Sequence, residues 1–246
     1  MERAIFLMFL CAASEGNIGK HIFVNQNLPW YGALTYCKLH HTDLSYVSRQ
    51  SDQDKLGASD QSKSGWIGLH RDPYNKTAWK WSAGGYITYT NWDDQQPSQS
   101  LQETAVFFST NGKWHDASET SLMRFYCINV SVVADMKTWE EAVRHCNKDQ
   151  TNLISLHSDN DRMTAQKVIQ KADITERVWI GLRFLVDHWL WVNGEPLDYQ
   201  SWPQGGDQDH QCPVWNRCGA LTKGGLWENR DCSERLNFIL KRKSRN

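Results

Sequence analysis

Hydrophobic and polar positions repeat along this chain with a long period. The apolar run Trp66-Ile67-Gly68-Leu69 returns as Trp179-Ile180-Gly181-Leu182. Each copy has a helix-like stretch with a central cysteine before the run, and a Trp-x-Trp and a Tyr-x-x-Trp after it. In the first copy these are Cys37, Trp79-Lys80-Trp81 and Tyr89 to Trp92. In the second copy they are Cys146, Trp189-Leu190-Trp191 and Tyr199 to Trp202. A period of about 110 residues matches a whole domain and exceeds any solenoid repeat. The chain is therefore predicted to contain two tandem domains, residues 21–129 and 131–241.

Helix signals open each copy. In the second copy, Thr138-Trp139-Glu140-Glu141 has the form of a capping box, in which a hydroxyl and a carboxylate satisfy free N–H groups at a helix start. The apolar residues that follow on one helical face are Trp139, Ala142, Val143 and Cys146. Ser158 opens a second helix. The first copy has a matching first helix after Pro29 and a shorter, glycine-containing second helix over residues 52–63.

Strands and long loops follow the helices. The two Trp-Ile-Gly-Leu runs are typical of buried strands, and a glycine inside such a strand indicates close packing of another element. Residues 91–102 and 201–216 are long and polar, and loops of this length are functional or disordered. About three residues, 128–130, separate the two copies. This linker is too short to be flexible, so we expect the domains to lie close together.

The N-terminus and the charge balance bear on localisation. Residues 1–16 contain a short apolar run after Arg3, followed by small residues, which resembles a secretory signal. A first strand or an anchor is the alternative. The run is too short to span a bilayer, and no later segment is long and apolar enough, so we expect a secreted protein without a transmembrane anchor. A net charge of −1 favours neither nucleic acid nor a membrane surface, and the basic tail, residues 242–246, is expected to be solvated.

Cysteines and sequons fit an exported chain. Loss of Cys11 with the signal leaves six cysteines, and an even number in an exported chain indicates disulfides. Two Asn-x-Ser/Thr triplets begin at Asn75 and Asn129 and are compatible with glycosylation. The 13 tryptophans serve cores and binding faces equally well, so their number alone decides neither.

The ordered motifs resemble the C-type lectin-like domain family, twice over. The helix cysteine, Trp-Ile-Gly-Leu, Trp-x-Trp, a Trp near the long loop and a closing aromatic strand all occur in the family's order. The resemblance implies an α+β fold of two tandem double-loop domains, each with two helices and two small antiparallel sheets. Tandem modules of this kind are similar to those of mannose-receptor-like proteins. It also implies a long upper loop that can bind calcium and sugar.

The resemblance implies disulfides as well. Cys37 and Cys127 match the bridge from the first helix to the last strand, and Cys218 and Cys232 match the bridge under the loop. Leu240 stands where the second copy would have its closing cysteine, which leaves Cys146 without the family's partner. Cys212 is additional. A Cys146–Cys212 bond is not expected, because the loop lies far from the first helix in this fold. An intermolecular bond or two unpaired thiols remain open.

In the family, the sugar-binding calcium takes oxygen ligands from a loop around a proline and from a Trp-Asn-Asp strand. The matching positions in copy one form the candidate carbohydrate site: Gln96, Ser98, Glu103, His115 and Asp116. The implied metal ligands are Gln96, Glu103 and Asp116, because Ser98 is short and Ca²⁺ disfavours histidine nitrogen. Calcium in domain 1 would bind weakly, on the order of 10⁻⁴–10⁻³ M. The alternative is a degenerate loop that binds no ion.

Copy two has no matching loop. An unrelated acidic site or a solvated loop are both compatible with Asp207, Asp209 and Glu228. A zinc site is not expected, because it would consume the cysteines of the predicted loop bridge. Its members would be His210, Cys212, Cys218 and Cys232.

Two functions follow from these observations. The first is an extracellular carbohydrate-binding protein, with any calcium-dependent site in domain 1 and with glycans or glycoproteins as partners. The alternative is a protein-binding module that has lost calcium and sugar binding. An enzyme is not expected, because no constellation of nucleophile, base and catalytic metal is visible in the sequence.

Overall fold

The computed structural model describes residues 21–58, 63–148, 151–204 and 210–241. The predicted signal and the basic tail lie outside these ranges. The elements of domain 1 are, in chain order, β1 (His21–Leu28), α2 (Trp30–His40), β2 (Asp43–Leu44), α3 (Gln50–Ala58), β3 (Gly65–Arg71), β4 (Trp79–Trp81), β5 (Ala105–Phe108), β6 (Trp114–Ala117) and β7 (Met123–Ile128).

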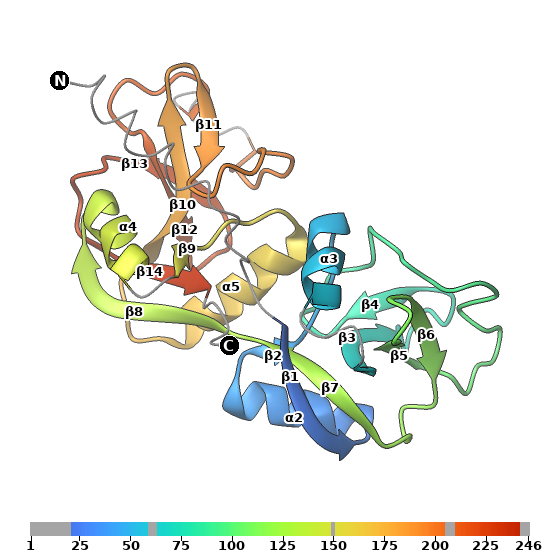
Figure 1. Ribbon diagram of the computed structural model, residues 1–246. Coiled ribbons are helices and arrows are strands. Elements are labelled where there is room, and N and C mark those ends of the chain that lie inside the picture. Colours follow the sequence, from blue (N-terminus) through green and yellow to red (C-terminus); the bar gives the residue numbers. More distant parts are fainter. Residues whose placement is uncertain (1–20, 59–62, 149–150, 205–209, 242–246) are drawn as a thin grey trace.

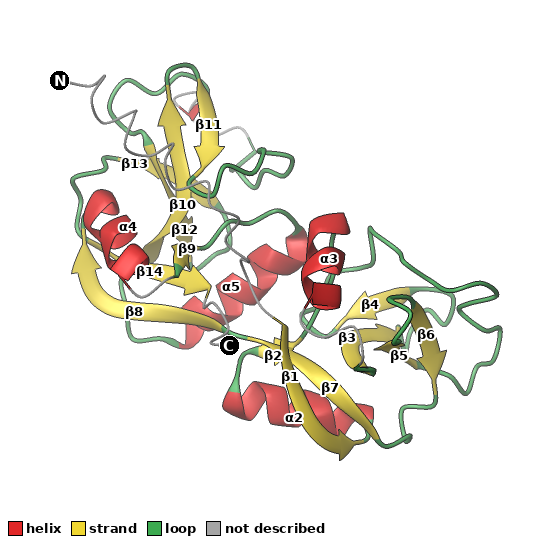
Figure 2. Ribbon diagram, viewed as in Figure 1, coloured by secondary structure: helices red, strands yellow, loops and turns green. Residues whose placement is uncertain are grey.

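Domain 2 repeats this order element by element (Figure 1, Figure 2). Its elements are β8 (Val130–Lys137), α4 (Trp139–Lys148), β9 (Asn152–Leu153), α5 (Asp159–Lys171), β10 (Arg177–Leu185), β11 (His188–Trp191), β12 (Cys218–Thr222), β13 (Trp227–Arg230) and β14 (Leu236–Lys241). The predicted α+β class and the tandem repeat are therefore confirmed.

The strands of each domain connect in the same way. Within the described residues, domain 1 has the strand order β1-β7-β3-β5-β6, with β2 on β7 and β4 on β3. Domain 2 has the order β8-β14-β10-β12-β13, with β9 on β14 and β11 on β10. The pairing of β3 with β7, and of β10 with β14, is parallel, and it joins the antiparallel parts into one mixed sheet.

The helix starts follow their local sequence. Thr138 N donates to Glu141 over 3.1 Å and Glu141 N donates to the Thr138 hydroxyl, which confirms the capping box of α4. Ser158 caps α5 by accepting from Asp161 N. The predicted bounds of α3 were wrong: it begins at Gln50, and Lys63 is not helical, since a glycine near its end weakens the helix. Within the described ranges, no helix combines the length and apolar character needed to cross a bilayer.

Most tryptophans are structural, and equivalent ones make equivalent contacts. Trp30 Nε1 donates to the Ile67 carbonyl over 2.8 Å, and Trp139 Nε1 donates to Ile180 over 2.9 Å. Each bond fixes the first helix to the central strand. Gly68 lies in that strand, where an added Cβ would meet the Ser82 hydroxyl at 2.6 Å. The predicted close packing at this glycine is confirmed.

The predicted disulfides are present and differ between the domains. Cys37 is bonded to Cys127, which ties α2 to β7, and Cys218 is bonded to Cys232. Cys146 is buried in the core cluster that also contains Leu240, while Cys212 is exposed. Domain 2 thus holds its first helix by apolar packing where domain 1 uses a covalent bond.

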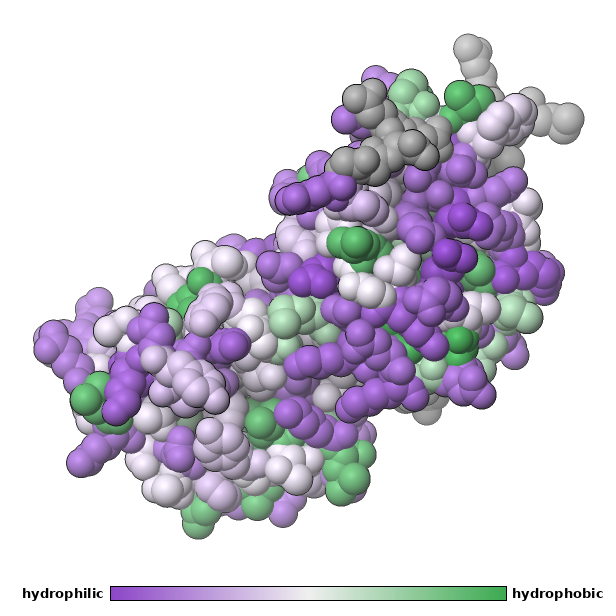
Figure 3. Space-filling model, turned by 180° about the vertical axis from the view of Figure 1, so that it is seen from behind, coloured by the Kyte–Doolittle hydropathy of each residue, from purple (hydrophilic) through white to green (hydrophobic). Residues whose placement is uncertain are grey.

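The domains are held side by side. Asn129 alone separates β7 from β8, and α3 and α5 lie next to each other between the two sheets (Figure 1). From behind, hydrophobic side chains form separate small patches among polar ones, on both domains (Figure 3). The described residues of that face therefore form no broad apolar surface.

Candidate functional site

The long loop between β4 and β5 and the strand β6 carry the predicted ligand residues of domain 1. The peptide bond from Gln96 to the following proline is cis. Glu103 lies just before β5, while His115 and Asp116 lie in β6. Since β5 and β6 are paired antiparallel, the end of the loop and β6 meet at one edge of the sheet.

Four of the five predicted residues are joined by hydrogen bonds around Asp116, and we call Gln96, Ser98, Glu103 and Asp116 the upper-loop cluster. Ser98 N donates to Asp116 Oδ1 over 2.8 Å, and Ser98 Oγ lies 3.2 Å from Oδ2. Asp116 N donates to Gln96 Oε1 over 3.2 Å. The Ser98 hydroxyl also donates to the Glu103 carboxylate. The structure therefore brings these four side chains together, and their role in binding an ion or a sugar stays a prediction.

His115, the fifth predicted residue, has different partners. Side chains alternate across a strand, so His115 and Asp116 point to opposite faces of β6. His115 Nε2 lies 2.9 Å from Asp93 Oδ2, and its ring stacks on Phe107 with centroids 5.3 Å apart. A hydrogen bond from Asn111, together with the His115 contact, lowers the pKa of Asp93 below its ordinary value. His115 thus anchors the loop through Asp93.

Arg71 is the residue of this site that sequence reasoning misses. Its Nη2 lies 3.6 Å from Asp116 Oδ2, and the Asp116 side chain has no exposed surface. The guanidinium also stacks over Trp79, 4.5 Å from the ring centroid. It donates to three backbone carbonyls, those of Lys76 at 2.8 Å, Ser100 at 3.3 Å and Glu103 at 3.3 Å. One cation therefore ties the β3–β4 loop, the upper loop and β6 together.

The cluster does not fit a calcium shell. Ca²⁺ takes six to eight oxygen ligands, and His115 adds none. The Arg71 guanidinium already balances the charge of Asp116. A divalent cation on the same carboxylate would lie close to the guanidinium, and such repulsion costs on the order of several kcal/mol in a partly buried site. These side chains fit an internal ion pair better than a bound ion.

The corresponding loop of domain 2 has other contacts in its described part. Trp202 stacks on His210 with ring centroids 4.8 Å apart. Glu228, one member of the hypothetical acidic site, pairs with Arg177 at 2.7 Å. Its other two members, Asp207 and Asp209, lie outside the described residues. What is described of this loop therefore gives the acidic site no support.

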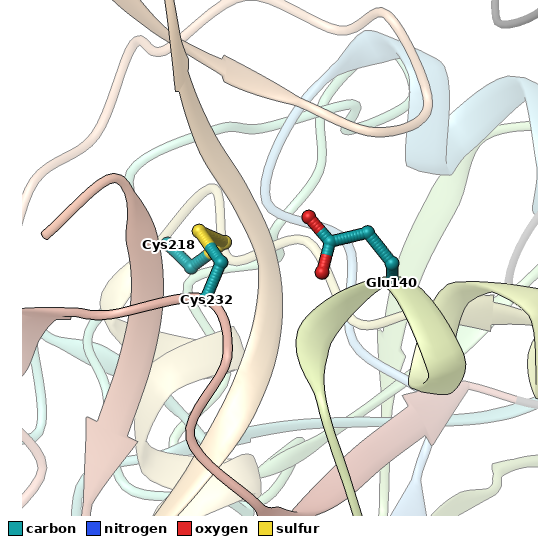
Figure 4. A group of neighbouring side chains, drawn as sticks. All are labelled: Glu140, Cys218 and Cys232. Carbon is teal, nitrogen blue, oxygen red and sulfur yellow. A yellow bond between two sulfur atoms is a disulfide. The ribbon is translucent and has the colours of Figure 1, made fainter. Parts of the chain in front are cut away.

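One group of metal-type side chains comes together in the part of the chain that the structure describes: Glu140, Cys218 and Cys232 (Figure 4). The two sulfur atoms are bonded to each other, so neither is a thiolate ligand. Arg183 Nη1 lies 2.5 Å from Glu140 Oε1 and 3.1 Å from the Cys218 sulfur. The group fastens the start of α4 to the loop disulfide and is not a metal site.

The two sequons lie in different surroundings. Asn75 is exposed in the β3–β4 loop, and its Oδ1 accepts from the Thr77 hydroxyl over 2.7 Å. Asn129 is partly buried between β7 and β8, where the Thr42 hydroxyl bonds to both backbone groups of Val130. Glycosylation stays a prediction at both positions, and Asn75 is the more accessible one.

A repeated α+β domain with a long upper loop defines the class of this protein, and comparison with known families supplies the family. Residues 26–128 and 135–241 each match the model of the lectin C-type domain. The two matches cover most of the chain. The chain belongs to the C-type lectin domain family and contains two tandem copies of the domain.

Similar proteins are long receptors. The human secretory phospholipase A2 receptor is 26% identical over 255 residues, which cover 89% of this chain and 17% of the relative. Human lymphocyte antigen 75 is 24% identical over 252 residues, 88% of this chain and 15% of the relative. Rat C-type mannose receptor 2 is 21% identical over 271 residues, which cover 89% of this chain and 18% of the relative. The chain thus spans less than a fifth of each relative's length, and none of the three is named as an enzyme.

Solved structures give matches to single domains. Human lithostathine matches 47% of this chain and 91% of its own, with 25% identity and a TM-score of 0.42. The carbohydrate-recognition domain of mouse scavenger receptor C-type lectin matches 44% of this chain and 86% of its own, with 22% identity and a TM-score of 0.41. Each match covers about one of the two domains.

Proposed function

We propose that this chain is an extracellular recognition protein whose first domain binds a protein ligand through its upper loop without calcium. The observation that carries this proposal is the contact of Arg71 Nη2 with Asp116 Oδ2 at 3.6 Å. The resemblance to the family would assign the Asp116 carboxylate to an ion. Here an arginine of the chain itself balances that charge and fixes the loop through its backbone bonds.

The two loops that Arg71 joins present side chains suited to a protein ligand. Tyr74, in the β3–β4 loop, is 98% exposed, and Leu101, in the upper loop, is 61% exposed. Tyr86 is exposed as well, and its hydroxyl donates to Asp72 over 2.8 Å. Aromatic side chains on a fixed backbone are favoured at the centres of protein interfaces.

Two further observations support this class of ligand and location. The relative named secretory phospholipase A2 receptor is named for a protein ligand. The disulfides and the predicted signal in residues 1–16 favour an oxidising, extracellular compartment. No particular partner is assigned from the relatives, because the chain spans a small part of each.

A second candidate function is weak, calcium-dependent carbohydrate binding by domain 1. It is favoured by the convergence of the upper-loop cluster, in which Ser98 and Glu103 lie beside Asp116. In this function the ion would displace Arg71 from the carboxylate. The two candidates differ in their response to chelator and in the chemistry of the target.

The experiment is binding of the labelled full-length chain to cells, in calcium and in chelator, after protease or glycosidase treatment of the cells. The proposal predicts binding that survives chelator and glycosidase but is lost after protease. It also predicts a loss in Tyr74→Ala/Leu101→Ala, while Leu39→Ala, an exposed position on α2, is the matched control. Binding lost in chelator and after glycosidase would establish the second candidate instead.

A further inference from the structure

The contact between the two domains includes one pair of elements that is used twice. In domain 1 these are α3 and the turn after β4, residues 82–85, and in domain 2 they are α5 and the turn after β11, residues 192–195. Lys167 Nζ, on α5, donates to the Ala83 carbonyl in the first turn over 2.7 Å. Lys55 Nζ, on α3, lies 3.4 Å from Glu195 in the second. Each turn therefore packs against the second helix of the other domain.

The first turn approaches α5 closely because it contains two glycines. Gly84 has a φ of +113°, a conformation that other residues rarely adopt, and an added Cβ would meet Met163 Cε at 2.8 Å. A Cβ on Gly85 would overlap the side chain of Asn160, which is itself buried. A larger residue at either position would therefore displace a side chain of α5, Met163 or the buried Asn160.

The second turn holds a carboxylate among three basic side chains. Glu195 Oε2 lies 2.5 Å from Arg49 and 2.6 Å from His157, and Oε1 lies 3.4 Å from Lys55. Arg49 and Lys55 belong to domain 1. Asn193 fixes the turn, since its Nδ2 donates to Glu195 Oε2 over 3.0 Å and its Oδ1 accepts from Glu195 N. The glutamate is thus presented to domain 1 in one conformation.

Equivalent aspartates lie at the start of the two helices of the contact. Asp161 accepts from His157 N at the start of α5, as Asp52 accepts from Ser48 N at the start of α3. Across the interface, the buried Tyr46 hydroxyl donates to Asp161 Oδ1 over 2.7 Å. Because each turn packs against the second helix of the other domain, the contact has the reciprocal arrangement of an isologous interface, as in a two-fold dimer.

We propose that this turn-and-helix surface is a self-complementary surface by which the two domains of this chain recognise each other, and that Glu195 against Arg49 and Lys55 selects this packing. The proposal is independent of the function of the upper loop, because it uses none of its residues. It makes the two domains one rigid body with a fixed angle between their upper loops.

The first test is zero-length carbodiimide coupling of the full-length chain, followed by peptide mass spectrometry. The reagent joins an amine to a carboxylate only in direct contact, so it should link Lys55 to Glu195. Lys137 and Asp135, which lie 3.8 Å apart within domain 2, report that the reagent works. Recovery of the Lys137–Asp135 link without the Lys55–Glu195 link would overturn the proposal.

The second test disrupts the surface with two different substitutions. Calorimetry measures the number of unfolding transitions, and small-angle scattering measures the radius of gyration. Glu195→Arg and Gly85→Ala should each split one unfolding transition into two and increase the radius of gyration. Arg49→Glu should partly rescue Glu195→Arg, and Asn160→Ala should rescue Gly85→Ala by removing the overlap. Gly57→Ala is the matched control, because an added Cβ there meets nothing within 4 Å. A single transition and unchanged scattering in both broken variants would refute the proposal.

Discussion

The two domains place different side chains at the same point of the same hairpin. Arg71 pairs with Trp79 across β3 and β4, and Phe184 pairs with Trp189 across β10 and β11. The arginine stacks on its tryptophan at 4.5 Å, and the phenylalanine packs edge-on at 5.5 Å. The hairpin therefore accepts either a cation or an aromatic ring beside the tryptophan.

The neighbouring strand explains which one is used. Asp116 of β6 pairs with Val106, and Asn229 of β13 pairs with Gly219 at the equivalent place. Domain 1 thus combines a buried carboxylate with an arginine, and domain 2 combines a neutral amide with a phenylalanine. A buried charge requires a partner, so these two positions act as a unit. The arginine of domain 1 therefore serves to balance the Asp116 carboxylate.

The largest expected effect comes from the bridge that only domain 1 has among the described residues. Cys37→Ser/Cys127→Ser removes a bond that joins residues 90 positions apart. Chain entropy predicts a loss of about 4–5 kcal/mol in the free energy of unfolding. Cys218→Ser/Cys232→Ser, with a separation of 14, should lose about 3 kcal/mol. Denaturant unfolding of the full chain measures both, and equal losses would contradict the entropic account.

The next effect tests the paired positions directly. Arg71→Phe converts one half of the pair to its domain 2 equivalent and leaves the Asp116 carboxylate buried without its cation. We expect a loss of about 3 kcal/mol, and Arg71→Phe/Asp116→Asn should recover part of it. Arg230→Ala breaks a partly exposed ion pair with Glu234 and should cost under about 1 kcal/mol. A double variant no more stable than Arg71→Phe would show that the two positions do not act as a unit.

A smaller, stabilising effect should follow from giving domain 2 the missing cysteine. Leu240 and Cys127 occupy equivalent positions, since each pairs with a leucine of the short strand β9 or β2. In the presence of oxidised glutathione, which takes up the two electrons and two protons, the thiol of Leu240→Cys should form a disulfide with Cys146, with a net gain of about 2 kcal/mol after the lost leucine packing is subtracted. Thiol titration and unfolding measure the outcome, and Leu240→Ser reports the packing loss alone. A new bond lowers the free-thiol count by one, so a count that rises by one instead would show that the two sites differ in geometry.

The smallest expected effect is on the acid side of the stability curve. Burial opposes ionisation of Glu195, but its contacts with His157 and Arg49, and the charge of Lys55, outweigh this and hold its pKa well below the ordinary value. A carboxylate with a lowered folded-state pKa stabilises above its unfolded pKa of about 4.3, and this stability is lost as the pH falls. Glu195→Gln should therefore lose on the order of 1 kcal/mol at neutral pH and show a flatter decline below about pH 5. Thermal melts in which Glu195→Gln loses stability below about pH 5 as steeply as the unmodified chain would contradict this prediction.

The sequence could predict the features that depend on local pattern. The repeat, the capping box at Thr138 and the cap at Ser158 each depend on residues a few positions apart, and the resemblance to the family supplied both disulfides. Arg71 could not be found this way, because its partners come from three segments that only folding brings together. The one available signal was the mismatch with Phe184, two positions after each Trp-Ile-Gly-Leu run.

The contact between the domains was predicted only in outline. The short linker predicts that the domains lie close, but it does not indicate which surfaces meet. Glu195 follows an ordinary Asn-Gly turn, and its role depends on Arg49, nearly 150 residues away in the chain. No local pattern contains a contact over such a separation.

The central claim is that Arg71 takes the place of calcium at the upper-loop cluster. Its most direct test is calorimetric titration of calcium into the full-length chain, beside Arg71→Gln and Asp116→Asn. We predict no saturable binding up to millimolar calcium in the unmodified chain, and weak binding, on the order of 10⁻³ M, only in Arg71→Gln. Millimolar or tighter binding by the unmodified chain that Asp116→Asn abolishes would contradict the claim and establish the ion at this site.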